Sequence, residues 1–262
     1  MRGTVSFKTC GSVLVTGANR GLELQIVQNL ASGGFSPGKI IATTRNLSGS
    51  QVETYLMSEL HLLVVILYVV RQDSIETCVE EVERLLDEDQ GLNLLINIAG
   101  VNLEADFQVV TAEMTMENFR TNAVAPLMIT KVICGRVGSG GKGAMGIQRA
   151  AVVNVSSLLG SVELNWGDRA NVFKWYPYRT SKVSVLRLTS RCMAVDLEPD
   201  GILCVAVHPG WVHTDMGGSR GERRGAPLSP EESVSSVLSV IGALTAKDHG
   251  TFLNYTGEQL PW

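Results

Sequence analysis

The sequence has no apolar run long enough to cross a membrane. Its longest, LLVVILYVV at residues 62–70, falls far short of the roughly 20 residues that a membrane-spanning helix needs. The amino-terminal stretch MRGTVSFKTC also lacks the apolar core of a secretory signal. These two absences predict a cytoplasmic protein with no membrane partner.

Cysteine is sparse and irregularly spaced. Five cysteines lie at positions 10, 78, 134, 192 and 204, and no C-x-x-C pair occurs. An odd number without paired spacing argues against a disulfide scaffold and fits no common metal site. We therefore expect reduced, mostly buried thiols, as is usual in the cytosol, and no bound metal.

The chain also lacks an excess of positive charge. It has 22 Lys and Arg against 26 Asp and Glu, a formal net charge of −4. Because binding to nucleic acid of any sequence depends on cationic contacts with phosphate, we expect no nucleic-acid partner. The one basic cluster, Arg220, Arg223 and Arg224, is interpreted as part of a solvated loop, because short basic runs are usually that.

What the sequence does contain is enough apolar material for one large core. Hydrophobic residues make up 45% of its 262 positions, which suits a single α/β domain. We place this domain at residues 11–262 and treat residues 1–10 as an N-terminal extension. No internal repeat or second domain is visible in the sequence.

Short, β-branched apolar runs alternate with helical patterns along the chain. Their continuous apolar character indicates strands buried on both faces, as in a parallel sheet. Repeated strand–helix units imply right-handed crossovers and a doubly wound sheet. The expected strands are residues 13–15, 39–43, 62–70, 92–98, 150–155, 202–207 and 251–254.

Two helix starts and one loop can be located from local patterns. Asp73 and Glu76 have the N-cap and N3 spacing of a capping box. Ser229 and Glu232 have the same spacing, with Pro230 at the first helical position. The glycine-rich stretch 135–149 predicts a flexible surface loop.

The stretch SVLVTGANRGLELQIVQNL combines a strand, a glycine turn and a helix. The apolar run Val13–Val15 leads into Thr16-Gly17, and Gly21 opens an amphipathic helix. Such a turn can hold a pyrophosphate on the N–H groups of the helix start. A third glycine would complete the pattern at position 23, where this sequence has Glu23. The turn alone is a weak indication of a dinucleotide site.

A second signal is the pair Tyr178 and Lys182 in YPYRTSKVSV, which share a face if the segment is helical. A tyrosine acts as a general acid near neutral pH if its pKa falls from about 10 to about 7, which is worth roughly 4 kcal/mol. One ammonium near 4 Å supplies about that much at an effective dielectric constant of about 20. Taken alone, such a pair is more often a surface coincidence.

Three further features are each ambiguous by themselves. Ser156-Ser157 follows a predicted strand, where parallel sheets bind ligands, although cap or turn serines are commoner. Asn122 interrupts an apolar helical face and could be a core amide bonded to backbone. Pro209-Gly210 ends another strand and could be a simple turn; Thr214 and Asp215 follow it.

All five features occur in one order along one α/β pattern, and in that order the sequence resembles the short-chain dehydrogenase/reductase superfamily. The resemblance runs from Val13 to Trp262, and TGANRGL, YRTSK, HPGWVHTDMGG and NYTGEQLPW look like the carbonyl-reductase, sniffer and C-factor-like branch. It implies a single Rossmann-like, doubly wound α/β domain with a mainly parallel seven-stranded sheet. It also implies an NADP(H)-linked reductase of small-molecule carbonyl substrates: aldehydes, ketones or quinones.

The same resemblance implies four catalytic residues. Tyr178 would protonate the carbonyl oxygen, while Lys182 would lower the pKa of Tyr178 and bond the nicotinamide ribose. Ser157 would polarise the carbonyl, and Asn122 would support a water that relays protons to Lys182. The hydride would pass from nicotinamide to the carbonyl carbon, so the protein supplies orientation and charge stabilisation and the cofactor carries the redox chemistry.

The implied cofactor site follows the glycine turn and the ends of the strands. NAD-dependent enzymes of such folds carry an acidic residue after the second strand, where this chain has Arg45 and no acid. Together with Arg20 in the glycine turn, Arg45 can pair with a 2′-phosphate, which favours NADP(H). The full predicted set is Thr16, Gly17, Asn19, Arg20, Gly21, Leu22, Arg45, Asn97, Ala99, Gly100, Tyr178, Lys182, Pro209, Gly210, Val212 and Thr214.

Three positions depart from the family pattern. Glu23 adds bulk and negative charge near the pyrophosphate, and each charge pair at about 6 Å costs up to roughly 3 kcal/mol at a dielectric constant of about 20. Screening removes most of that cost if the side chain points to solvent. Val69 stands where the family usually has an aspartate for the adenine amino group, a loss of about 1–3 kcal/mol. Ile98 replaces the second asparagine of an N-N-A-G motif.

Two hypotheses for the function therefore remain. The first is an active NADPH-dependent carbonyl reductase; the second is a weak or inactive homologue that serves as a binding or interaction module. Within the longer segment between Ser157 and Tyr178, ELNWGDRANVFKW is expected at the substrate mouth, where its tryptophans could form an apolar wall, or else on the surface. Family members often dimerise through two helices, here about residues 113–134 and 178–197, which makes a homodimer the candidate assembly.

Overall fold

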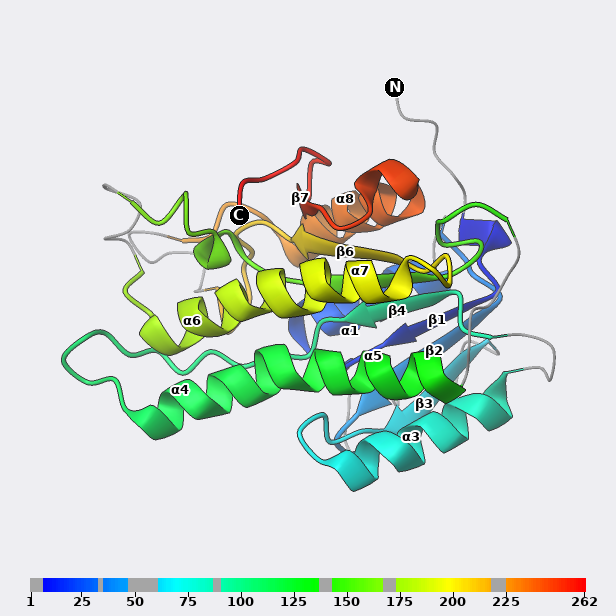
Figure 1. Ribbon diagram of the computed structural model, residues 1–262, viewed down its shortest axis with the longest axis horizontal. Helices are drawn as coiled ribbons and strands as arrows, with labels where there is room; N and C mark the ends of the chain where they lie inside the picture. The colour runs from blue at the N-terminus through cyan, green and yellow to red at the C-terminus, as the bar shows by residue number, and fades with distance from the viewer. Residues whose placement is uncertain are drawn as a thin grey trace.

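The computed structural model describes residues 7–32, 35–46, 61–86, 91–136, 143–166, 173–217 and 225–262. Seven strands form one sheet in the order β3-β2-β1-β4-β5-β6-β7, and every neighbouring pair is parallel (Figure 1). The predicted doubly wound, seven-stranded α/β fold is confirmed. The strands are β1 (Ser12–Val15), β2 (Lys39–Thr44), β3 (Leu62–Ile66), β4 (Leu94–Asn97), β5 (Ala151–Val155), β6 (Leu203–His208) and β7 (Phe252–Asn254).

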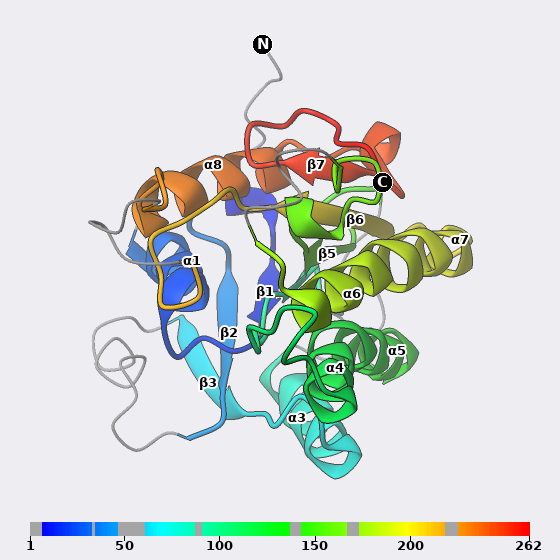
Figure 2. The same cartoon turned by 90° about the vertical axis from the view of Figure 1, so that its left-hand side faces the viewer.

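Helices cover both faces of the sheet (Figure 2). On one face lie α1 (Gly21–Ser32) and α8 (Pro230–Gly242), which contact each other. On the other lie α3 (Gln72–Leu85), α4 (Ala112–Phe119), α5 (Ala125–Arg136), α6 (Tyr176–Ser184) and α7 (Met193–Leu197). Each face has its own apolar core, so the strands are buried on both sides, as their continuous apolar sequence predicted.

Short helical segments complete the chain. Two π-helical segments, Arg120–Val124 and Val185–Cys192, join α4 to α5 and α6 to α7, so each pair forms one long rod. The 3₁₀ turns are Phe7–Thr9, Leu158–Gly160 and Ala246–Asp248. The two rods correspond to the helices predicted at residues 113–134 and 178–197.

The third strand is shorter than predicted. It ends at Ile66 instead of continuing to Val70. Leu67 still donates a backbone hydrogen bond to Thr44, but the chain then turns, and the N–H of Arg71 bonds the carbonyl of Tyr68. The apolar run therefore predicts a strand that is too long, because Tyr68 and Val70 lie in the turn after it and are exposed.

One of the two predicted helix starts is confirmed and the other is wrong. Ser229 and Glu232 form a complete capping box at the start of α8. In α3 the N-cap is Arg71, which makes no side-chain cap, and Asp73 lies within the first turn. Asp73 instead forms an exposed ion pair with Arg71, so its charge was satisfied by a neighbour rather than by the helix backbone.

The stretch 135–149 is not a surface loop throughout. Helix α5 continues to Arg136, and residues 137–142 lie outside the described residues. In the described part, Ile147 is 1% exposed and belongs to the core between the sheet and α1. Arg149 donates to the carbonyls of Gly143 and Asp200. The prediction of a surface loop therefore holds for residues 143–144, which are exposed, and is wrong for residues 146–147, which are buried.

The cysteines follow the expected pattern of reduced, mostly buried thiols. Cys10, Cys78 and Cys204 are buried, and burial raises the pKa of each thiol to about 12. Cys134 is partly buried and Cys192 is exposed.

In the described part of the chain, no helix is both long and apolar enough to cross a membrane, and no cluster of three potential metal ligands occurs. The cluster Arg220, Arg223 and Arg224 lies outside the described residues.

The described residues of the predicted N-terminal extension pack with the domain. Phe7 is 1% exposed, and its ring meets that of Phe35 edge-on at 5.5 Å. Cys10 is equally buried, and its carbonyl accepts a bond from Gly38. The folded unit therefore includes residues 7–10.

This packing predicts that Phe7→Ala lowers the free energy of unfolding by about 3–5 kcal/mol, because a fully buried ring is removed and leaves a cavity. Phe107→Ala is the matched control, since Phe107 is 70% exposed, and it should change stability by about 0.5 kcal/mol or less. Urea denaturation measures both. Equal stability of the two variants would contradict the placement of Phe7 in the core.

Candidate active site

The predicted site residues gather at the carboxyl edge of the sheet. In parallel sheets of this type, ligands bind outside the strand ends where the strand order reverses. Here that point lies between β1 and β4, which are paired neighbours although they are far apart in sequence. The glycine turn after β1 and the segments after β4, β5 and β6 all begin at this edge.

The glycine turn has the backbone geometry that its sequence predicts. Gly17 has a φ of +79° and Gly21 a φ of +57°, a region that side chains with a Cβ rarely adopt. A Cβ on Gly17 would lie 2.8 Å from the Cβ of Ala99, so the close approach of the β1 and β4 ends also requires glycine. Leu22 is partly buried and packs on the core beneath the turn.

Thr16 holds the two central strand ends together. Its hydroxyl accepts hydrogen bonds from the backbone N–H groups of Ile98 (3.0 Å) and Ala99 (3.1 Å). The side chain is 1% exposed. The side chain of Thr16 has a structural role, because both of these bonds go to the backbone after β4, and its predicted cofactor contact stays a prediction.

The end of β2 braces the glycine turn from the other side. The Thr43 hydroxyl accepts from the N–H of Gly17 at 3.0 Å, and its carbonyl accepts from the N–H of Ala18 at 2.7 Å. The hydroxyl of Thr44 donates to the side-chain oxygen of Asn19. Asn19, predicted as a cofactor contact, is thus oriented by the strand end that precedes Arg45.

The two arginines predicted to bind a 2′-phosphate are both exposed at this edge. Arg45 directly follows β2. Arg20 lies in the glycine turn and pairs with Asp215 at 3.4 Å, with both side chains largely exposed. Such an exposed pair contributes about 0–1 kcal/mol, so it can open without a large cost.

Glu23 turns inward rather than to solvent. A Cβ built on Gly21 would lie 3.3 Å from the Glu23 Oε2 atom and 3.7 Å from the Cγ2 atom of Thr214. The carboxylate therefore folds back over the first turn of α1. Burial raises the pKa of Glu23 to about 7, although a bond from its own backbone N–H and the charges of Arg20 and Lys182 lower it.

Ser157, Tyr178 and Lys182 meet as predicted. The Ser157 hydroxyl bonds the side chain of Tyr178, and the Lys182 ammonium lies 5.5 Å from the centroid of the Tyr178 ring. The same ammonium donates to the carbonyl of Val155, at the end of β5, at 2.8 Å. Strand β5 and helix α6 are thus joined through the functional side chains themselves.

Gly160 allows this approach and was missed in the sequence. A Cβ at Gly160 would lie 2.7 Å from the backbone carbonyl of Lys182. The turn Leu158–Gly160 therefore packs directly on the backbone of α6 and brings Ser157 to Tyr178. The sequence contains this glycine three residues after Ser157, but it does not show the contact with α6 that requires a glycine there.

Burial, rather than Lys182, dominates the pKa of Tyr178. Burial raises this pKa to about 12, the bond from Ser157 lowers it, and the charge of Glu23 raises it. The predicted fall of this pKa toward neutrality is therefore not found, because burial is the largest effect on the phenol. Burial lowers the pKa of Lys182 to about 8, against an upward effect of Glu23. The phenol is therefore protonated at neutral pH.

Asn122 lies in the π-helical segment between α4 and α5, a distortion that is frequent at functional sites. Its oxygen accepts from the N–H of Val101 at 2.9 Å. Its amide donates to the carbonyl of Val101 (2.8 Å) and to the hydroxyl of Ser181 (2.9 Å). The side chain therefore fastens the segment after β4 to α6. Its predicted part in a proton relay stays a prediction.

The end of β4 and the residues after it are held by side-chain hydrogen bonds and close packing. Asn97 donates to Thr130 and Asn154, and its buried side-chain oxygen has no partner. A Cβ on Gly100 would lie 3.1 Å from the side-chain oxygen of Asn122. Ile98 is buried in the apolar core, so the hydrophobic residue at this unusual position is accommodated by packing. Val69 likewise packs, partly buried, beside the other core.

The segment after β6 is held by contacts with α8 and with residue Leu228. Gly210 has a φ of +88°, and the carbonyl of Pro209 accepts from Ser233 at 2.6 Å. Val212 is buried and bridges to Leu228. Thr214 accepts from the N–H of Gly217 at 3.1 Å and lies over the glycine turn. Of the predicted cofactor residues of this segment, Thr214 is the one that lies beside the glycine turn.

An aromatic cluster lies beside Tyr178. The Trp175 ring meets that of Tyr178 edge-on at 6.3 Å, and Phe173 lies between Trp175 (4.5 Å) and Trp211 (5.3 Å). The expected apolar wall is therefore present for Trp175, but Trp166 is 87% exposed and takes no part. Residues 167–172 of the same segment lie outside the described residues. Phe173 and Trp211 were not predicted.

His208 is a further residue that the sequence analysis missed. It ends β6 and is 7% exposed, and its Nδ1 atom has no partner. Burial and the nearby charge of Lys182 lower its pKa to about 3. A neutral imidazole therefore borders the site. The only sequence signal was a histidine at the end of a buried strand, which does not distinguish a core residue from a functional one.

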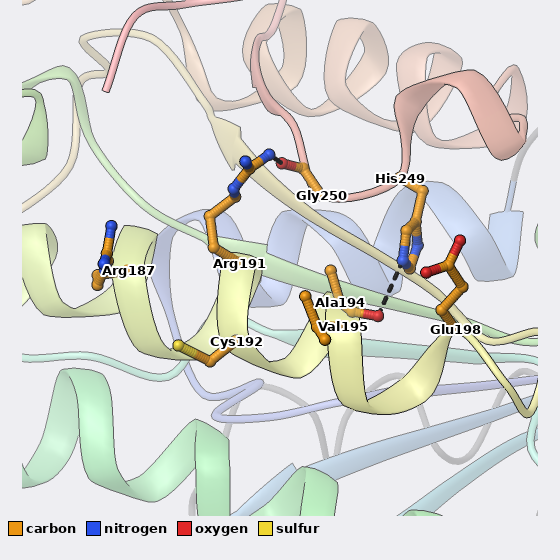
Figure 3. A pocket seen from close by; sticks show the side chains of 8 residues that line it. All are labelled: Arg187, Arg191, Cys192, Ala194, Val195, Glu198, His249 and Gly250. Atoms are coloured by element: carbon orange, nitrogen blue, oxygen red, sulfur yellow. Dashed lines mark hydrogen bonds between the residues drawn. The ribbon is translucent and has the colours of Figure 1, made fainter.

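Two surface hollows lie apart from these residues. The first, of about 350 Å³, lies between α7 and the segment before β7 (Figure 3), and its His249 is satisfied by Cys204 and Ala194. Arg191 at its rim donates to the carbonyl of Gly250. The second, of about 500 Å³, lies on the outer face of α6 and includes Tyr176. Neither is lined by Tyr178 or Lys182.

Comparison with known proteins gives a consistent family. A family profile described as short chain dehydrogenase matches residues 11–225. The C-signal protein of Myxococcus xanthus is 35% identical over 172 residues, which are 65% of this chain and 93% of that protein.

Two solved structures are similar over nearly the whole chain. NADPH-bound carbonyl reductase from chicken fatty liver is 34% identical, with a TM-score of 0.87 over 96% of this chain and 94% of that one. The carbonyl reductase Sniffer of D. melanogaster is 33% identical, with a TM-score of 0.85 over 96% and 99% of the two chains.

The bonds of Thr16 predict that Thr16→Val lowers the free energy of unfolding by about 2–4 kcal/mol, because two buried N–H groups lose their acceptor. Thr16→Ser keeps the hydroxyl and should stay within about 1 kcal/mol of the parent protein. Denaturant titration of the three proteins provides the measurement. If valine were as well tolerated as serine, the structural role of the hydroxyl would be refuted.

Proposed function

The chain belongs to the short-chain dehydrogenase family, and on that basis we propose that it is an NADP(H)-dependent reductase of small carbonyl compounds. One observation carries the proposal: Tyr178 is hydrogen-bonded to Ser157 and lies beside the Lys182 ammonium, at the edge where the glycine turn ends. A phenol, a hydroxyl and an ammonium in this arrangement can bind a carbonyl oxygen and deliver a proton to it.

Tyr178 is the proposed proton donor. Its pKa of about 12 keeps the phenol protonated at every physiological pH, and the protonated form is the one that carbonyl reduction requires. Ser157 already bonds the phenol, so a carbonyl oxygen placed between the two hydroxyls would accept from both. These bonds strengthen as negative charge develops on that oxygen.

In this proposal Lys182 and Asn122 support the proton transfer through Tyr178 and helix α6. The ammonium of Lys182 lies beside the Tyr178 ring, so its positive charge stabilises the phenolate that remains after proton transfer. Asn122 bonds both Val101 and Ser181, which fixes α6 relative to the segment after β4. The proposed role of Asn122 is thus to position the residues that handle the proton.

The crevice fits a dinucleotide. Gly17 and Gly21 leave the N–H groups at the start of α1 free of Cβ atoms above them, and such groups bind phosphate. The buried side-chain oxygen of Asn97, at the end of β4, has no partner. When bound, the cofactor supplies the hydride. Chicken-liver carbonyl reductase is described with NADPH, and Arg20 and Arg45 favour the same 2′-phosphorylated cofactor here.

The proposed substrates are small apolar aldehydes, ketones or quinones. The rings of Phe173, Trp175 and Trp211 border Tyr178, and flat aromatic or quinone carbonyls can pack on such rings. His208, neutral at physiological pH, adds no charge to this side of the site. An uncharged carbonyl compound is therefore a better match than a charged one.

Replacement of the proposed acid gives a direct test. Tyr178→Phe should lower kcat for NADPH-dependent reduction of a quinone by about 10²–10⁴-fold, the usual contribution of a general acid, while NADPH binding stays unchanged. Tyr176→Phe is the matched control, because Tyr176 is an exposed tyrosine of the same helix, and it should keep full activity. Unchanged turnover of the Tyr178 variant would refute the assigned role.

Cofactor choice can be tested through the arginine after β2. Arg45→Ala should weaken NADPH binding by about 10–100-fold, because a charge-assisted bond is worth about 1.5–3 kcal/mol, and should leave NADH binding unchanged. Arg71→Ala is the control, because Arg71 is another exposed arginine and lies at the start of α3. Fluorescence titration measures both cofactors, and equal losses for NADPH and NADH would contradict 2′-phosphate recognition.

The second candidate is a catalytically weak homologue that acts as a binding or interaction module. The inward Glu23 carboxylate favours it, and a relative of 35% identity carries the name C-signal rather than that of a reductase. Titration with NADPH separates the two. Unchanged fluorescence and unchanged thermal stability at about 1 mM NADPH would favour the module, because ligands that bind the folded state raise its stability.

A further inference from the structure

Glu23 lies where a phosphate group would approach the helix. It is the third residue of α1, and its Oε2 atom lies over Gly21, whose missing side chain leaves the helix start open. The carboxylate accepts from its own backbone N–H. An anion at this place satisfies the helix start in the same way that a pyrophosphate does.

The charged groups around Glu23 come from each neighbouring element. Arg20 of the glycine turn and Lys182 of α6 are the cations that interact with it. Arg20 is itself paired with Asp215, in the segment after β6. Tyr178 of α6 is protonated, and its pKa is raised by Glu23. His208, at the end of β6, is uncharged at physiological pH.

We infer that the Glu23 carboxylate is a built-in competitor of the cofactor pyrophosphate, so that NADPH binds with uptake of one proton by Glu23. This inference rests on the proposed cofactor and names the residue that regulates its affinity. With the carboxylate ionised, the pyrophosphate meets a like charge held at the helix start. With the carboxyl protonated, the charge conflict is gone and the side chain can stay or rotate away.

The direction of the pH dependence follows. In the free protein the pKa of Glu23 is about 7, above its ordinary value near 4.5, because burial disfavours the charged form. The form that binds best is therefore present at pH 6 and is about one tenth of the protein at pH 8. NADPH affinity should fall about tenfold between these two pH values.

The test compares Glu23→Gln and Glu23→Gly with the unchanged protein by NADPH fluorescence titration at about pH 6 and about pH 8. Glutamine keeps the size of the side chain and removes its charge. At pH 8 it should bind NADPH about tenfold more tightly than the unchanged protein, and at pH 6 about equally. Glu113→Gln is the matched control, because Glu113 is an exposed glutamate in the first turn of α4, and it should leave both constants unchanged.

Calorimetry in two buffers of different ionisation enthalpy gives a second readout. At pH 8 the unchanged protein should take up nearly one proton more per NADPH than Glu23→Gln, and this difference cancels any titration of the 2′-phosphate.

If Glu23→Gln has the affinity and pH profile of the unchanged protein, the inference is refuted while the cofactor proposal stands. If only the glycine variant binds more tightly, bulk rather than charge is the obstacle and the inference is also refuted. If no variant binds NADPH at either pH, the proposed function itself fails.

Discussion

The site depends on the parallel alignment of β1 and β4. Because both strands run in the same direction, the glycine turn and the segment containing Ala99 and Gly100 leave the sheet side by side. The hydroxyl of Thr16 then fastens one strand end to the other with two backbone bonds. Gly17 lets the two segments touch. The rest of the site is positioned relative to this contact between the ends of β1 and β4, because β5 and β6 pair in turn beyond β4 in the same sheet.

A second set of contacts holds Ser157, Tyr178 and Lys182 beside the ends of these strands. Lys182 reaches the end of β5, and Gly160 lets the following turn lie on the backbone of α6. The result is a site in which burial rather than charge sets the protonation states. Burial holds Tyr178 protonated, keeps His208 neutral and leaves Lys182 with a pKa of about 8.

Glu23 connects the cofactor crevice to these same groups. Its charge acts on both Lys182 and Tyr178, although it belongs to the helix that begins at the glycine turn. A change in its protonation therefore affects the phosphate end and the proton-donor end of one crevice together. A glycine at this position would remove both effects, so the substitution changes how the site responds to pH without changing the fold.

The sequence by itself determined the order of the strands and helices along the chain, the capping box of α8 and the grouping of Ser157, Tyr178 and Lys182. These depend on local patterns: apolar runs, helical spacing and glycine turns. Predictions from the sequence were wrong where contacts between residues far apart in the chain set the burial or the pKa of a side chain. Burial reversed the expected pKa of Tyr178, and the core took in Ile147, which lies in a glycine-rich stretch. The inward direction of Glu23, the contact of Gly160 with α6 and the grouping of Phe173 with Trp211 also depend on packing between elements, because side-chain direction and desolvation are set by contacts that no local pattern contains.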